Sequence, residues 1–142
     1  MTDRKARRRP LDAVRPPFVG REQDLDQLLT LARRPSTRCL TLIGLGGIGK
    51  TRLAVELATR LAADRDPFMV ELAAVVDLDD LLPSIAEALL LTTVGDDPFH
   101  DVCSALTGRP TVLVLDNLEQ LPGAGGLVVD LLAAVPELLV VA

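Results

Sequence analysis

The chain contains 142 residues, of which 49% are apolar and 25% charged, and its net charge is −5. These values are typical of one globular domain and exclude an intrinsically disordered chain. Aromatic residues make up only 2%, which argues against a carbohydrate cleft or a base-stacking surface. No apolar run approaches the ~20 residues that cross a bilayer, so we expect no membrane partner. Two cysteines and one histidine argue against a disulfide framework or a zinc site and favour the reducing cytoplasm.

The charges are distributed unevenly along the chain. Residues 1–38 hold ten Lys/Arg and five Asp/Glu, whereas residues 39–142 hold five and fifteen. This acidic body argues against DNA binding through the whole surface. Residues 1–17 are basic and contain three prolines, so we predict a solvated tail ahead of a domain over 18–142. A contact between this tail and nucleic acid is the alternative that the charges leave open.

The first half of the domain predicts a helix, a strand and a second helix. Apolar residues in 21–34 and 50–63 recur at the spacing of one helical face. Between them, residues 39–43 are apolar and β-branched, which indicates a buried strand. Glu56 and Arg60 are four residues apart in the second helix and should pair on its outer side.

The second half continues the alternation of strands and helices. Asp77, Asp79 and Asp80 are good N-caps for a helix that runs to about residue 91. Asp97 and Pro98 begin another helix, which Gly108 closes, and Gly125-Gly126 open a helix over 127–135. The predicted strands are 68–73, 111–115 and 138–141. Strands that are apolar throughout and alternate with helices are typical of a parallel sheet covered on both faces, so we predict a three-layer α/β/α fold.

Residues 44–51 match the phosphate-binding pattern G-x-x-x-x-G-K-[ST] at every fixed position, between a predicted strand and a predicted helix. Glycines let backbone N–H groups converge on a phosphate, and the helix start adds partial positive charge. Lys50 would reach the β- and γ-phosphates, and the Thr51 hydroxyl would coordinate Mg²⁺. The predicted phosphate-binding residues are Gly44, Leu45, Gly46, Gly47, Ile48, Gly49, Lys50 and Thr51.

Residues 111–116 form an apolar strand that ends in an aspartate, which is the Walker B pattern. Asp116 would hold Mg²⁺ through water, together with Thr51. An active ATPase usually has a second carboxylate directly after this aspartate to polarise the attacking water, but this chain has Asn117. Glu119 is a candidate catalytic substitute, although we expect its side chain to point away from the γ-phosphate. Slow or absent hydrolysis is therefore predicted.

Four segments resemble the STAND class of signal-transduction P-loop ATPases, which contains the NB-ARC proteins: FVGREQDLDQL, LTLIGLGGIGKTRLAVELA, FMVELAAVVDLDDLLPSIAEAL and TVLVLDNLEQL. They cover most of residues 18–142 and are most similar to domains of large bacterial transcriptional regulators of the AfsR/SARP and LuxR-like types. The resemblance implies a nucleotide-dependent switch that binds ATP or ADP with Mg²⁺. It also implies that backbone groups of Val19, Gly20 and Arg21 lie near the adenine.

The resemblance further implies a P-loop fold of the ASCE type, with strand order 5-1-4-3-2. The strand at 138–141 would then lie between the two motif strands. A fifth strand, a γ-phosphate sensor, a helical lid and a winged-helix domain would follow, so we expect a fragment truncated after its fourth strand. The strand at 39–43 would be left at an open edge. Nucleic-acid binding would then occur only indirectly, through domains absent from this chain, and self-association would belong to the full-length protein.

Two further functions remain open at this point. A small P-loop kinase would need a lid with clustered arginines, whereas the basic residues after Thr51 are scattered. A nucleotide-binding interaction module would hold ADP or ATP without turnover, which the amide at Asn117 favours. Phosphate transfer to a small acceptor would indicate the kinase, and tight ADP binding without turnover would indicate the module.

Overall fold

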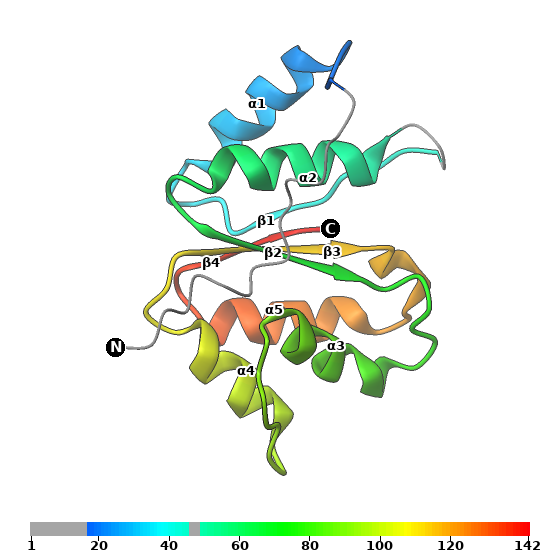
Figure 1. Cartoon of the computed structure of the whole chain (residues 1–142), viewed down its shortest axis with the longest axis vertical. Helices are drawn as coiled ribbons and strands as arrows, with labels where there is room; N and C mark the ends of the chain where they lie inside the picture. Colours follow the sequence, from blue (N-terminus) through cyan, green and yellow to red (C-terminus); the bar gives the residue numbers. More distant parts are fainter. Residues whose placement is uncertain (1–16, 46–48) are drawn as a thin grey trace.

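The computed structural model describes residues 17–45 and 49–142, which form three layers (Figure 1). The middle layer is a parallel sheet in the order β1-β4-β3-β2. The strands are β1 (Cys39–Leu40), β2 (Asp66–Glu71), β3 (Thr111–Asp116) and β4 (Leu138–Val141). Helix α2 (Lys50–Leu61) covers one face, with α1 (Glu22–Ala32) packed against it, and α3 (Leu81–Ala88), α4 (Pro98–Leu106) and α5 (Ala124–Ala134) lie on the other side. The α/β/α prediction is confirmed, and so is the position of β4 between β1 and β3.

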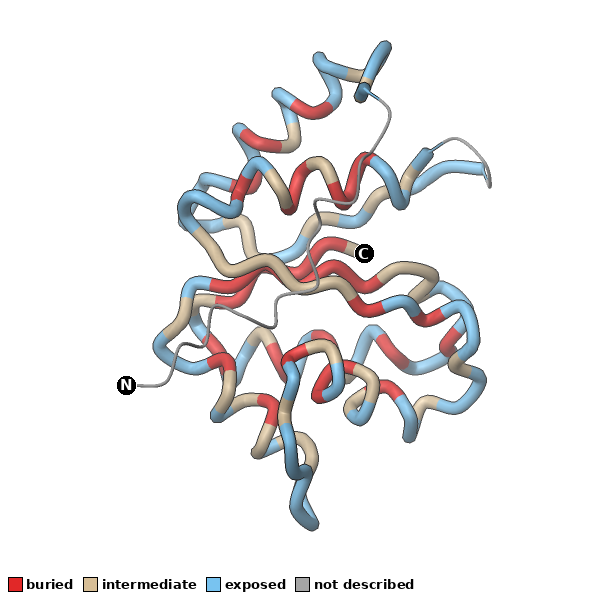
Figure 2. The backbone as a smooth tube through the Cα atoms, in the orientation of Figure 1, coloured by how far each residue is buried: buried red, intermediate tan, exposed pale blue. Residues whose placement is uncertain are grey.

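The two inner strands are buried on both faces (Figure 2). Successive side chains of a strand point to opposite faces, so each inner strand supplies both hydrophobic cores. Val112 and Val114 of β3 pack with the apolar side chains of α1 and α2. Leu113 and Leu115 pack with those of α3, α4 and α5. The edge strand β2 is mostly half-buried, and its six residues pair with β3 along its whole length, from Asp66 opposite Thr111 onward.

The predicted helices are present, with small shifts at their ends. Leu53, Leu57 and Leu61 of α2 are buried, while the Glu56 and Arg60 side chains pair at 3.0 Å on its outer side. In α1, the buried residues are Leu25, Leu29 and Ala32. These patterns confirm that the apolar spacing of the sequence marks the faces that pack into the core.

Of the predicted caps of the later helices, Asp97 and Asp77 accept backbone N–H groups, whereas Asp80, the N-cap residue of α3, makes no side-chain capping hydrogen bond. The Asp97 carboxylate accepts the N–H of His100 at 3.0 Å and begins α4. Asp77 accepts the N–H of Asp79 at 3.1 Å and begins the one-turn helix η2 (Leu78–Asp80), which leads into α3. The predicted start of α5 at residue 127 is wrong, because Gly123, with φ +86°, turns the chain and the helix begins directly after it.

The first strand is shorter and more exposed than the sequence predicts. Only Cys39–Leu40 form β1, although the N–H of Leu42 still donates to the carbonyl of Ala142 at 2.7 Å. The side chain of Cys39 is exposed and Ile43 is 90% exposed. The prediction of a buried strand over 39–43 is therefore wrong. Among the described strands, β1 has β4 as its one neighbour, so an apolar sequence lies at an edge of the sheet.

Arg38 fastens this edge to the interior. Its guanidinium donates to the carbonyls of Leu132 at 2.9 Å, Val135 at 2.6 Å and Leu138 at 2.8 Å. These acceptors lie at the end of α5 and the start of β4, where helical carbonyls lack partners within the helix. The chain entering β1 is thereby held against the connection between α5 and β4.

We expect Cys39 to react with a thiol-alkylating reagent much faster than Cys103. Cys39 is exposed on β1, whereas Cys103 is half-buried on α4. Burial, and secondly the nearby Asp97 carboxylate, raises the pKa of the Cys103 thiol, so less of it is the reactive thiolate. Mass spectrometry of Cys39→Ser and Cys103→Ser variants measures each rate separately. Equal rates would show that β1 is covered in solution.

Candidate functional site

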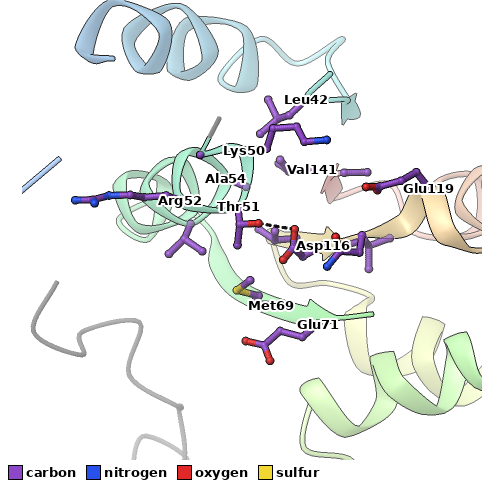
Figure 3. Close-up of a pocket in the computed structure, with 16 residues that line it drawn as sticks. Leu42, Lys50, Thr51, Arg52, Ala54, Met69, Glu71, Asp116, Glu119 and Val141 are labelled. Atoms are coloured by element: carbon purple, nitrogen blue, oxygen red, sulfur yellow. Dashed lines mark hydrogen bonds between the residues drawn. The ribbon is translucent and has the colours of Figure 1, made fainter. Parts of the chain in front are cut away.

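A cavity of about 630 Å³ lies at the carboxyl ends of β2, β3 and β4, beside the amino end of α2 (Figure 3). Ligands of parallel α/β proteins usually bind at this edge of the sheet, and the volume is typical of small-molecule sites. The lining residues come from both predicted motifs and from strand ends. They are Leu42, Gly49, Lys50, Thr51, Arg52, Ala54, Val55, Met69, Glu71, Val114, Leu115, Asp116, Asn117, Glu119, Val141 and Ala142.

The amino end of α2 supplies an anion-binding surface to this cavity. Gly49 is the N-cap residue and has φ +84°, a conformation that glycine adopts without steric cost. The first helical hydrogen bond runs from the N–H of Leu53 to the carbonyl of Gly49, so the N–H groups of the first turn precede the helical pattern. The first turn contains no acidic residue, and Lys50 adds a positive charge there. Helix starts of this kind bind phosphate groups.

Thr51 and Asp116 meet across the cavity, as the sequence predicts. The Thr51 hydroxyl donates to Oδ1 of Asp116 at 2.9 Å, although the two residues are 65 positions apart (Figure 3). A hydroxyl and a carboxylate are the hard oxygen ligands that Mg²⁺ prefers. These residues therefore fit a magnesium ion.

Glu119 lies at the same cavity, and its orientation relative to a γ-phosphate stays a prediction. It belongs to the one-turn helix η3 (Leu118–Gln120), which begins directly after Asn117. Figure 3 shows the Glu119 carboxylate directed toward the cavity rather than away from it. Between β3 and η3, Asn117 has a φ of +65°, in the left-handed region.

Glu71, the last residue of β2, is a cavity residue that was not predicted from the sequence. It pairs in register with Asp116 of β3 and lines the cavity, with its carboxylate pointing away from Asp116 (Figure 3). The available signal was the parallel sheet itself, because the carboxyl ends of neighbouring parallel strands lie at one edge.

The predicted adenine-proximal residues lie beside the loop. Val19, Gly20 and Arg21 are not among the described residues that line the cavity. Nη1 of Arg21 lies 4.0 Å from the position that a Cβ of Gly49 would take, and Arg21 also pairs with Asp24 at 2.9 Å. Their contact with adenine stays a prediction.

Arg52 holds the segment 17–18, which precedes α1, against α2. It donates to the carbonyl of Pro17 at 2.7 Å, and its guanidinium lies 6.0 Å from the centre of the Phe18 ring.

The predicted phosphate loop is described only in part. Gly44 and Leu45 are exposed, and Gly49, Lys50 and Thr51 lie at the cavity. Gly46, Gly47 and Ile48 fall outside the described residues, and so does the predicted tail up to residue 16.

Residues 17–141 match the family model of the AAA ATPase domain, so the chain belongs to this family. A Mycobacterium tuberculosis protein named "Putative HTH-type transcriptional regulator" is 36% identical over 110 residues, which cover 74% of this chain and 12% of that protein. An uncharacterized protein of the same organism is 31% identical over 85% of this chain and 31% of its own length. The chaperone protein ClpB of Dichelobacter nodosus is 28% identical over 82% of this chain and 14% of its own length.

Two further findings concern size and membranes. The chain spans only about an eighth of the length of the regulator that it resembles. Within the described residues, every helix is too short or too polar to cross a bilayer.

We expect Asp116→Asn to abolish the gain in ATP affinity that Mg²⁺ provides, while binding of ADP without Mg²⁺ stays nearly intact. An asparagine still accepts the Thr51 hydroxyl but lacks the charge that holds a cation. Calorimetric titrations with and without Mg²⁺ measure both effects.

Glu71→Gln is the matched control, because it removes a carboxylate of the same cavity that points away from Asp116, and it should keep the Mg²⁺ effect. Equal loss of both affinities in Asp116→Asn would instead show that Asp116 supports the fold.

Proposed function

We propose that this AAA ATPase domain binds ATP and ADP with Mg²⁺ in the cavity at the carboxyl end of the sheet. The observation that carries the proposal is the contact between Thr51 and Asp116 at 2.9 Å. This contact joins Thr51, at the end of the phosphate-loop motif, to the Walker B aspartate. Thr51 lies in the first turn of α2, where no side chain caps the helix. Membership of the AAA ATPase family supports the same conclusion.

Each cavity residue has a role in this proposal. The first turn of α2 and the Lys50 ammonium would bind the β- and γ-phosphates, and Thr51 and Asp116 would hold Mg²⁺. When bound, the ion would neutralise phosphate charge and orient the terminal phosphate. Leu42, Val141 and Met69 give the cavity apolar walls.

We further propose that the domain acts as a nucleotide-dependent switch of the STAND, NB-ARC-like type within a longer transcriptional regulator. The regulator-like relative supports this, since the present chain matches a small part of it. ATP and ADP differ by the γ-phosphate, so a switch requires contacts that only ATP makes. Lys50 and the end of β3 both line the cavity and would make such contacts. Nucleic acid would be bound by other domains of the regulator, and self-association would involve the full-length protein.

We expect Lys50→Ala to weaken ATP binding about tenfold or more, because a charge-assisted contact contributes on the order of 1.5–3 kcal/mol. Arg60→Ala is the matched control. It removes one positive charge from the same helix, but Arg60 pairs with Glu56 on the outer side and does not line the cavity. Titration with a fluorescent ATP analogue measures both variants. ATP binding by Lys50→Ala at the wild-type affinity would refute phosphate binding by this loop.

We expect the chain to hydrolyse ATP well below the ~1–10³ s⁻¹ of typical enzymes. Asn117 occupies the position that normally carries the water-polarising carboxylate, and a neutral amide is a poor base. Single-turnover hydrolysis measures the rate, and Asn117→Asp should raise it. Turnover near one per second by the wild type would contradict slow hydrolysis. The proposal that the cavity binds nucleotide would still stand.

A further inference from the structure

Asn117 has a backbone conformation that few residue types adopt. Its φ and ψ are +65° and +32°, and among the described residues Leu90 is the one other non-glycine residue with positive φ. This left-handed region is unfavourable for most L-residues, whereas asparagine visits it more readily. The amide residue that replaces the usual carboxylate is therefore also one of the few types that suits this turn.

The turn determines where the next residues lie. Asn117 is the N-cap of η3, and its carbonyl accepts the N–H of Gln120 at 3.2 Å. Leu118 packs against the core between the sheet and helices α3, α4 and α5. Leu121 is buried in the same core, with 3% of its surface exposed. These two leucines fix the inner side of the single helical turn. Glu119 then lies on the cavity side, where Figure 3 shows its carboxylate.

We propose that Asn117 is a positioning residue, whose left-handed backbone places the Glu119 carboxylate where it polarises the water that attacks ATP. The inference rests on the proposed function, since it concerns hydrolysis of the nucleotide bound in the same cavity. The slow turnover expected above would then depend on Glu119, because the turn directs its carboxylate to the cavity while residue 117 contributes only an amide.

The reaction is ordinary hydrolysis. The water oxygen forms a bond to the γ-phosphorus, and the bond from that phosphorus to the oxygen bridging to the β-phosphate breaks. One proton of the water passes to the Glu119 carboxylate and is later released to solvent. The products are ADP and inorganic phosphate. Asn117 transfers no proton and acts only through the placement of Glu119.

Single-turnover hydrolysis of ATP, together with ATP and ADP affinities, tests the proposal. Glu119→Gln should slow turnover about 10²-fold, the lower end of what a general base contributes. Asn117→Ala should slow it about tenfold, because alanine disfavours the left-handed region by a factor of this order. Asn117→Gly should recover most of that loss, since glycine adopts positive φ freely although it lacks the amide. The nucleotide affinities should change little in all three variants.

Gly108→Ala is the matched control for backbone strain. Gly108 has φ +73° with open space around its Cβ position, and it follows α4 outside the cavity. An alanine there is strained as in Asn117→Ala, yet turnover should equal that of the wild type. Slowed turnover in Gly108→Ala to the extent seen in Asn117→Ala would overturn the proposal, because general destabilisation would then account for both.

The double variant Asn117→Ala/Glu119→Gln separates positioning from a direct role. If Asn117 acts through Glu119, the double variant should turn over no more slowly than Glu119→Gln alone. Additive losses would overturn the inference, and so would a wild type that binds ATP without any turnover. Absence of nucleotide binding by the wild type would instead overturn the proposed function on which the inference rests.

Discussion

The whole arrangement depends on the burial of β3 and β4 between two layers of helices. Side chains of these strands alternate between the two cores, so their register and direction are fixed by apolar packing on both faces. The end of β3 is therefore a fixed point, and Asp116 is placed there. Helix α2 packs on the same strands through Leu57 and Leu61, which brings Thr51 within hydrogen-bond distance of Asp116.

Those parts of the fold that depend on local pattern could be predicted from the sequence. The apolar spacing of α2, the Asp97 cap of α4 and the apolar run of β3 each have a local cause, and the structure confirms them. The phosphate-loop and Walker B patterns likewise identified Thr51 and Asp116, which the structure places in contact. Binding of nucleotide by these residues remains a prediction that the proposed titrations test.

The features that sequence reasoning got wrong or missed depend on neighbours in space. The apolar run 39–43 does not reveal how many strands flank it in the sheet. Its exposure results from the edge position of β1, which only the strand order shows. Glu119 lines the cavity directly after a residue with positive φ, Asn117, and residue types alone do not specify that backbone angle. Glu71 required the register between β2 and β3, because nothing near it in the sequence resembles a motif.

The register of β2 against β3 also has an electrostatic consequence for the ligand. The cavity is lined by the cations Lys50 and Arg52 and by the carboxylates Glu71, Asp116 and Glu119, a formal excess of one negative charge. A free triphosphate is a polyanion and would be repelled by these carboxylates over about 8 Å at physiological ionic strength. A nucleotide that arrives already complexed to a divalent cation brings compensating charge. In the proposed function, a nucleotide bound to Mg²⁺ would therefore meet less repulsion from these carboxylates than a free nucleotide, whose binding would depend on Lys50 and the amino end of α2.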